Sequence, residues 1–106
     1  TFNGMGKILS TAEKITISAT AATGTINYDV ITQSVLYYTT ASSGNFTVNL
    51  RGDGSNSMNN IMDTGESVTV AFLVTNTGTP YYNSAVQVDG SGVTPEWQGG
   101  AAPLTL

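Results

Sequence analysis

The segment ESVTVAFLVTN, from Glu66 to Asn76, sets the first expectation for the fold. Its residues alternate between two sides, and a period of two is typical of a β-strand because successive side chains point to opposite faces of a sheet. Both sides contain apolar residues, so we expect this strand to lie centrally in a sheet. One side holds Val68, Val70, Phe72 and Val74, and the other holds Thr69, Ala71, Leu73 and Thr75.

The same period marks four segments before it, which are EKITISAT (13–20), TINYDVIT (25–32), QSVLYYTT (33–40) and NFTVNL (45–50). In the first of them Ile15 and Ile17 alternate with Thr16 and Ser18, which indicates a half-buried strand. Short turn-like sequences separate the segments, and we interpret 33–50 as a hairpin. Asp89-Gly90 and Ser91-Gly92, between Val88 and Val93, indicate a second hairpin.

Closely spaced strands, with no helical period longer than one turn, predict an all-β fold: an antiparallel β-sandwich or a jelly roll. The one helical turn that we expect lies near 57–62, where Ser57 is a suitable N-cap for Met58, Ile61 and Met62 at positions i, i+3 and i+4. We expect a single β domain over 1–106, with 1–12 and 98–106 as extended arms. Because the sequence begins with Thr1, we also expect it to be a segment of a longer polypeptide.

Composition excludes several kinds of function. The 106 residues include no cysteine and no histidine, so zinc sites and nucleophilic catalysis with a histidine base lack their usual groups. Only 9% of residues are charged, and the net charge is −4, so nucleic-acid binding is not expected. The longest apolar runs are too short to span a membrane. We expect neither an enzyme nor a cofactor, and no catalytic residue is assigned.

The segment LRGDGSNSMNNIMDTGES (50–67) holds four of the ten charged residues. Its Arg51-Gly52-Asp53 triplet is one that integrin-type receptors read, but a glycine-centred turn between strands needs polar flanks in any case, and we interpret it as a turn. Oxygen-bearing side chains in the same segment raise the question of a Ca²⁺ site, with Asp53, Asp63 and Glu66 as the metal candidates. Measured against an EF-hand loop, Met58 stands where glycine is required and Thr64 where the bidentate glutamate is required. Asp63 and Glu66 flank a turn, which argues against a catalytic carboxylate pair.

Aromatic residues are the remaining candidates for binding. Tyr38, Tyr81, Tyr82 and Trp97 are candidates for contacts between subunits or with a ligand, and sugar rings are a natural ligand because their apolar faces stack on aromatic side chains. Neighbouring tyrosines in a strand point to opposite faces, so each pair exposes at most one ring.

The sequence from Phe46 to Gly100 resembles a module of structural proteins from tailed bacteriophages, especially marine cyanophages. The resemblance covers about half of the chain and is carried by several spaced blocks: NFTVNLRGDGS (45–55), MNNIMDTGES (58–67), the V-T-N…Y-Y element from Val74 to Tyr82, and VTPEWQGG (93–100). It implies a virion component in a fibre, tail or surface appendage, with no enzyme activity. It implies no catalytic residues.

A charge-poor β domain with few gatekeeping charges on its strand edges also favours assembly, because such edges pair readily with other chains. We therefore expect a homo-oligomeric structural protein of the virion, an extracellular particle, with copies of itself and other virion proteins as partners. The alternative is a carbohydrate-binding adhesin that recognises a glycan on the host surface.

Overall fold

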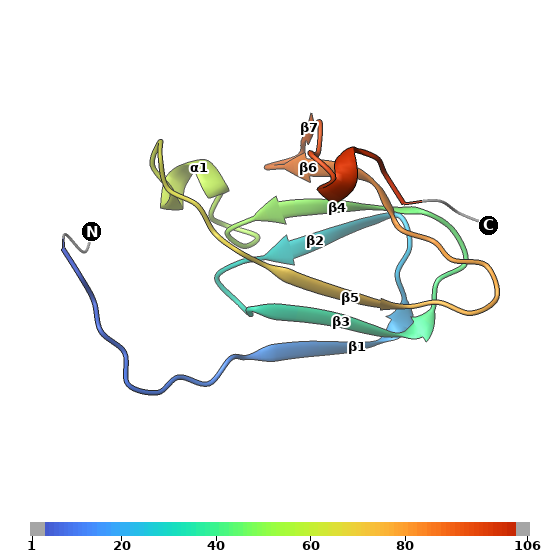
Figure 1. Cartoon of the computed structure of the whole chain (residues 1–106), viewed down its shortest axis with the longest axis horizontal. Coiled ribbons are helices and arrows are strands. Elements are labelled where there is room, and N and C mark those ends of the chain that lie inside the picture. The colour runs from blue at the N-terminus through green and yellow to red at the C-terminus, as the bar shows by residue number, and fades with distance from the viewer. Residues whose placement is uncertain (1–3, 104–106) are drawn as a thin grey trace.

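The computed structural model describes residues 4–103, so the outermost parts of the two expected arms, 1–3 and 104–106, lie outside the described residues. Seven strands and two short helical turns follow one another along the chain (Figure 1). Their bounds are β1 Ile15–Ala21, β2 Thr25–Asp29, β3 Val35–Ala41, β4 Phe46–Arg51, α1 Met58–Ile61, β5 Ala71–Thr75, β6 Asn83–Val88, β7 Ser91–Val93 and the 3₁₀ turn η1 Gln98–Gly100. The all-β prediction is therefore confirmed.

From β1 to β6, consecutive strands alternate between two sheets. One sheet, sheet A, has the order β1-β3-β5, and the other, sheet B, has the order β2-β4-β6-β7. All pairs are parallel except β6–β7, which is antiparallel. The chain thus winds through three coils, β1–β2, β3–β4 and β5–β6, each stacked on the one before. This arrangement is a short parallel β-solenoid.

The expected antiparallel connectivity of a sandwich or jelly roll is therefore wrong. A parallel pair needs a long crossover between its two strands, and in this chain the crossover is the intervening strand of the opposite sheet. The segments 33–40 and 45–50 are strands as expected, but they lie in different sheets and form no hairpin. A period of two is the same in both kinds of sheet, so the pattern alone does not distinguish them.

The core lies between the two sheets. Its most buried apolar side chains come from β2, β3, β4 and the β1–β2 turn, with Val30, Tyr38, Leu50, Val70, Phe72 and Val74 packed against them. Phe72 joins the sheets, because its ring centroid lies 5.6 Å from that of Phe46 and 5.8 Å from that of Tyr38. Aromatic rings at this separation and tilt attract one another beyond the area they bury. The buried apolar set is Ala22, Ile26, Tyr28, Leu36, Phe46 and Val48.

The segment 66–76 differs from its prediction in two ways. Only Ala71–Thr75 forms a strand, and this strand, β5, lies at one edge of sheet A while β3 occupies the centre. The inward alternation holds, since Phe72 and Val74 pack on the core. The edge position follows from the winding, because β5 belongs to the last coil and no later strand joins sheet A.

The hairpin at 89–92 is confirmed. β6 and β7 pair with Val88 opposite Ser91, and the turn between them is Asp89-Gly90. Both residues have positive φ, 50° for Asp89 and 79° for Gly90. This conformation suits the tight turns that match the twist of paired strands, and Asp and Gly adopt it at low cost.

Within residues 4–103, no helix has the length and hydropathy needed to cross a membrane.

Candidate functional site

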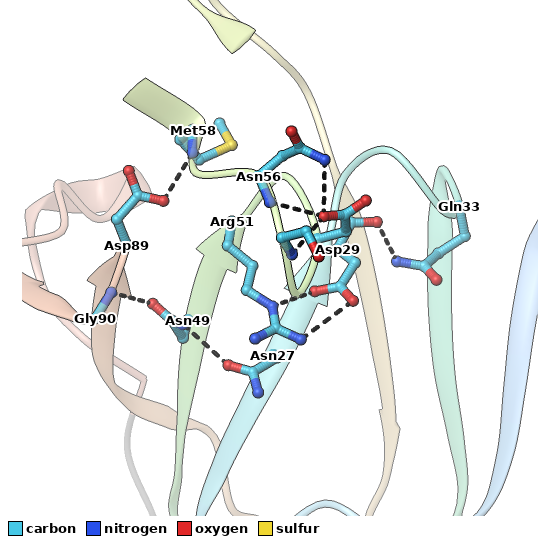
Figure 2. Close-up of polar contacts among 11 residues, drawn as sticks. Asn27, Asp29, Gln33, Asn49, Arg51, Asn56, Met58, Asp89 and Gly90 are labelled. Carbon is cyan, nitrogen blue, oxygen red and sulfur yellow. Dashed lines mark hydrogen bonds and ion pairs between the residues drawn. The ribbon is translucent and has the colours of Figure 1, made fainter. Parts of the chain in front are cut away.

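The segment from Arg51 to Ser67 leaves the solenoid between β4 and β5 and packs beside sheet B (Figures 1 and 2). Its first residue, Arg51, lies directly opposite Asp29 of β2 in the parallel register. The Arg51 Nε donates to Asp29 Oδ1 at 2.6 Å, and Nη2 donates to Oδ2 at 3.4 Å. This hydrogen bond to Asp29 raises the pKa of the guanidinium above its ordinary value. The arginine therefore joins two neighbouring coils.

Asp53 closes a local turn. Its Oδ1 accepts hydrogen bonds from the backbone N–H groups of Ser55 and Asn56, both at 2.8 Å, and from Nδ2 of Asn56 at 3.0 Å (Figure 2). These bonds, with that from Ser55 first, lower the pKa of the carboxyl below its ordinary value, because they favour the charged form. Since Arg51 and Asp53 are both engaged within the chain, the triplet has the contacts of a structural turn.

The short helix α1 confirms the sequence prediction in position and cap. Ser57 is its N-cap, and the Ser57 hydroxyl accepts from the backbone N–H of Asn60 at 3.1 Å. Asp89, from the β6–β7 turn, accepts from the backbone N–H of Met58 at 2.7 Å (Figure 2). It also accepts from the backbone N–H of Asn59 at 3.1 Å. No residue of α1 is buried, and Ile61 is exposed, so the helix does not pack an apolar side against the core. Polar contacts hold it instead.

A row of amides connects the coils on the outer face of sheet B. Asn27, Asn49 and Gln87 occupy the same register position on β2, β4 and β6. Asn49 is buried, and its Nδ2 donates to Asn27 Oδ1 at 2.9 Å while its Oδ1 accepts from the backbone N–H of Gly90 at 2.9 Å. Both ends of the Asn49 amide are thus paired, which avoids the free-energy cost of leaving a buried polar side chain unsatisfied.

Asn49 and Arg51 of β4, residues of the segment 53–60 and the β6–β7 turn line a surface pocket of about 450 Å³. Its wall is polar, and much of its hydrogen-bonding capacity is already used within the chain by the contacts given above. The pocket is thus built chiefly by the interactions that fix the segment 51–61 to sheet B. Its lining consists of Asn49, Arg51, Asp53, Gly54, Ser55, Asn56, Ser57, Asn60, Asp89 and Gly90.

The three carboxylates proposed for calcium lie in separate local arrangements. Asp53 lines the pocket, whereas Asp63 and Glu66 form a turn in which Glu66 Oε1 accepts from the backbone N–H of Asp63 at 2.7 Å. Over residues 4–103, no group of three or more His, Cys, Asp or Glu side chains is arranged to hold a metal ion. The geometry therefore gives no support to a calcium site.

The four aromatic candidates do not share one surface. Tyr38 lies on the inner face of sheet A against Phe72, and this burial raises the pKa of its phenol. Tyr82 and Trp97 pack edge to face, with ring centroids 5.9 Å apart. Tyr81 is held through its backbone, because its N–H donates to Asn76 Oδ1 and its C=O accepts from Asn76 Nδ2, both at 3.0 Å. Tyr82 and Trp97 are thus brought together, and Tyr38 belongs to the core.

The outer face of sheet A is the apolar surface that the sequence interpretation did not anticipate. Ile15, Ile17 and Leu73 are 53%, 65% and 50% exposed, respectively. The register places them close together, because Ile17 pairs with Tyr37, which in turn pairs with Leu73. Isolated exposed aliphatic residues are ordinary, but several that share one face of a sheet are typical of an interaction surface.

The orientation of β1 explains why this surface was missed. The alternation of Ile15 and Ile17 with Thr16 and Ser18 suggested that the isoleucines face the core, but Thr16 and Ser18 do so. Thr16 pairs with buried Leu36, and its hydroxyl donates to Oε1 of Gln33, itself buried, at 3.0 Å. Because a sheet shares its faces between strands, the inward side of β3 fixes the inward side of β1. Ile15 and Ile17 form an apolar row on the outer face of β1, and the inner face of that strand is polar. The apolar row was the one feature of the sequence that could have indicated this surface.

No family model, curated protein or solved structure matches the chain.

Proposed function

We propose that this chain is a non-enzymatic structural component of a tailed-bacteriophage virion and that it assembles through copies of itself. The observation that carries the proposal is the apolar outer face of sheet A, formed around Ile15, Ile17 and Leu73. Burying the exposed half of each of these side chains against another copy contributes about 1 kcal/mol per side chain. The likeness of 46–100 to phage structural modules supplies the virion context.

The two edges of sheet A support the same proposal. β1 and β5 each pair with β3 on one side only, so each presents backbone donors and acceptors on the other side. Proteins usually protect such edges with charges, proline or a covering segment. Within β1 and β5 there is no charged residue and no proline. Other copies and other virion proteins are the partners that these edges suit.

The mass of the purified chain, measured by light scattering and by sedimentation over a wide concentration range, tests the proposal. We expect a defined oligomer, and Ile17→Glu should shift it to monomer because a carboxylate would be buried in the contact. Ile61→Glu, at another exposed isoleucine away from sheet A, is the matched control and should leave the oligomer intact. Circular dichroism checks that both variants fold.

A wild-type chain that stays monomeric at the highest concentration contradicts the assembly proposal. An antiserum raised against the chain should label particles of the phage that encodes it, and failure to label them contradicts the virion location.

A carbohydrate-binding adhesin is the second candidate function. The observation that favours it is the pocket of about 450 Å³, whose amide, carboxylate and guanidinium groups are of the types that bind sugar hydroxyls. A glycan array distinguishes the two functions. Binding that Asn60→Ala removes would support an adhesin, and an array without binding leaves the structural function as the only candidate.

A further inference from the structure

The segment before β1 is an arm with apolar side chains in solvent. Residues 4–14 are exposed throughout, and Met5 and Ile8 are 83% and 76% exposed, with Leu9 fully so. Figure 1 shows this dark blue segment running away from the sheets. Three large apolar residues within five positions, all in water, are unfavourable unless another surface covers them.

A groove of about 540 Å³ lies where the arm joins the solenoid. Its walls are Thr11–Lys14, the β2–β3 turn (30–34) and the residues 68–70 that precede β5. Val30, Ile31, Val68 and Val70 make its lining partly apolar, and both Ile31 and Val68 are about half exposed. The groove therefore offers aliphatic surface to an aliphatic ligand.

The arm carries a positive charge in an otherwise acidic molecule. Lys7 is the only charged residue in 4–11, whereas the rest of the chain carries Lys14 and Arg51 against seven Asp and Glu residues. Glu13 and Lys14 both line the groove, so the negative charge that attracts the arm is that of the molecule as a whole. A segment with one positive charge is therefore attracted to an otherwise acidic molecule.

We propose that the arm of one copy binds in the groove of a second copy, with Ile8 and Leu9 against Ile31 and Val68. This inference rests on the self-assembly proposed above and names the contact that completes it. The outer face of sheet A alone is too small, because three half-exposed aliphatic side chains offer less than the ~800 Å² per partner of a standard interface. The arm supplies the additional apolar surface.

The geometry favours a second copy over the arm's own groove. Thr11 is part of the groove wall, and it follows Leu9 by only two residues. Two residues span about 7 Å when extended, and this connection contains neither the glycine nor the proline that usually reverses a chain. Leu9, which is fully exposed, therefore does not contact its own groove and is free to bind that of a neighbour.

Cross-linking between pairs of introduced cysteines tests the inference. Because the sequence contains no native cysteine, only the introduced thiols react. A tagged Leu9→Cys chain is mixed with an untagged Ile31→Cys chain, or with Val68→Cys as a second groove position, and treated with a short bismaleimide. We expect several-fold more of the mixed product than in the control mixture of Leu9→Cys with Val93→Cys. Val93 is exposed on β7, away from the groove.

The outcomes separate this inference from the proposal beneath it. If the wild-type chain is an oligomer but the groove pairs link no better than the control, the arm exchange is wrong and assembly stands. If the double variant Leu9→Cys/Ile31→Cys links only within one chain, the arm occupies its own groove and the exchange is again wrong. A monomeric wild-type chain overturns both.

Discussion

Gly52 is the residue of the Arg-Gly-Asp triplet for which the fold has the strictest requirement. It is buried, and a Cβ atom there would lie 2.6 Å from the carbonyl oxygen of Asn56, a distance that real Cβ contacts do not reach. The turn that Asp53 closes brings this carbonyl close, because the backbone N–H of Asp53 donates to it at 2.9 Å. Packing space alone thus requires glycine at this position.

We expect Gly52→Ala to lower the free energy of unfolding by about 1–3 kcal/mol, the usual range for overpacking a close contact. Gly54→Ala is the matched control, because the nearest atom to its Cβ is Nη2 of Arg51 at 3.9 Å. Urea titration of both variants measures the difference. Equal stability of the two variants would show that the turn relaxes freely.

Asp53 gives the stability a dependence on pH. Hydrogen bonds to its carboxylate lower its pKa in the folded state below the ordinary 3.8, so its contribution is present above that value and is lost as the pH falls through the folded pKa. Asp53→Asn keeps an acceptor oxygen but not the charge. We expect the wild type to melt a few degrees above Asp53→Asn at pH 7 and the two to converge below pH 3.8. A difference in melting temperature that is independent of pH would contradict this.

At the scale of elements, the helix α1 is held by another element rather than by its own packing. A helix of four residues is too short to be stable alone, and none of its residues is buried. The carboxylate of Asp89 satisfies two of its free backbone N–H groups, and the positive φ of Asp89 aims that carboxylate from the β6–β7 turn. The C-terminal hairpin and the 51–67 segment are therefore coupled.

Asp89→Gly tests this coupling without straining the turn, because glycine keeps the positive φ but removes both acceptors. We expect faster amide hydrogen exchange at Met58 and Asn59 and a loss of about 1 kcal/mol, as for removal of a helix cap. Asp89→Asn retains one acceptor and should fall between Asp89→Gly and the wild type. Unchanged exchange in Asp89→Gly would mean that Ser57 alone holds the helix.

At the scale of the whole molecule, the coils define the fold and the 51–67 segment is an addition to it. Five residues, 30–34, separate Asp29 from Val35, whereas nineteen, 52–70, separate their register partners Arg51 and Ala71. The longer connection thus holds fourteen extra residues, equal in number to Asp53–Glu66. These two connections otherwise join the same points of successive coils.

We expect a chain without 53–66 to keep its parallel sheets, because the remaining Gly52 and 67–70 match the five-residue connection one coil earlier. Its circular dichroism should remain that of a β protein and its unfolding cooperative, at a lower melting temperature because the Asp53 and Asp89 contacts are lost. Deletion of 36–49, also fourteen residues but inside the second coil, is the control and should abolish folding. A non-cooperative Δ53–66 chain would show that the segment is essential to the solenoid.

Sequence alone determined the local features of this protein. The period of two located β1 to β4 and the part of β5 at 71–75, Ser57 marked the start of α1, and Asp89-Gly90 marked the one hairpin. Each of these depends on residues a few positions apart, through the alternation of a strand, the cap of a helix or the φ that a turn requires. β2 and β4 each have one clearly apolar side in the sequence, and that side faces the core.

Only the tertiary structure decided which strands pair, which way β1 faces and which polar groups meet. The alternation of a strand does not identify the strand with which it pairs. The short turns that take the chain from one sheet to the other therefore resembled the turns of hairpins. The contacts Asp29–Arg51 and Asp89–α1 join residues 22 or more positions apart, and no local signal predicted them. Because β3 had to bury Leu36 and Tyr38, the isoleucines of β1 were left in solvent, and this long-range constraint created the surface on which the proposed assembly depends.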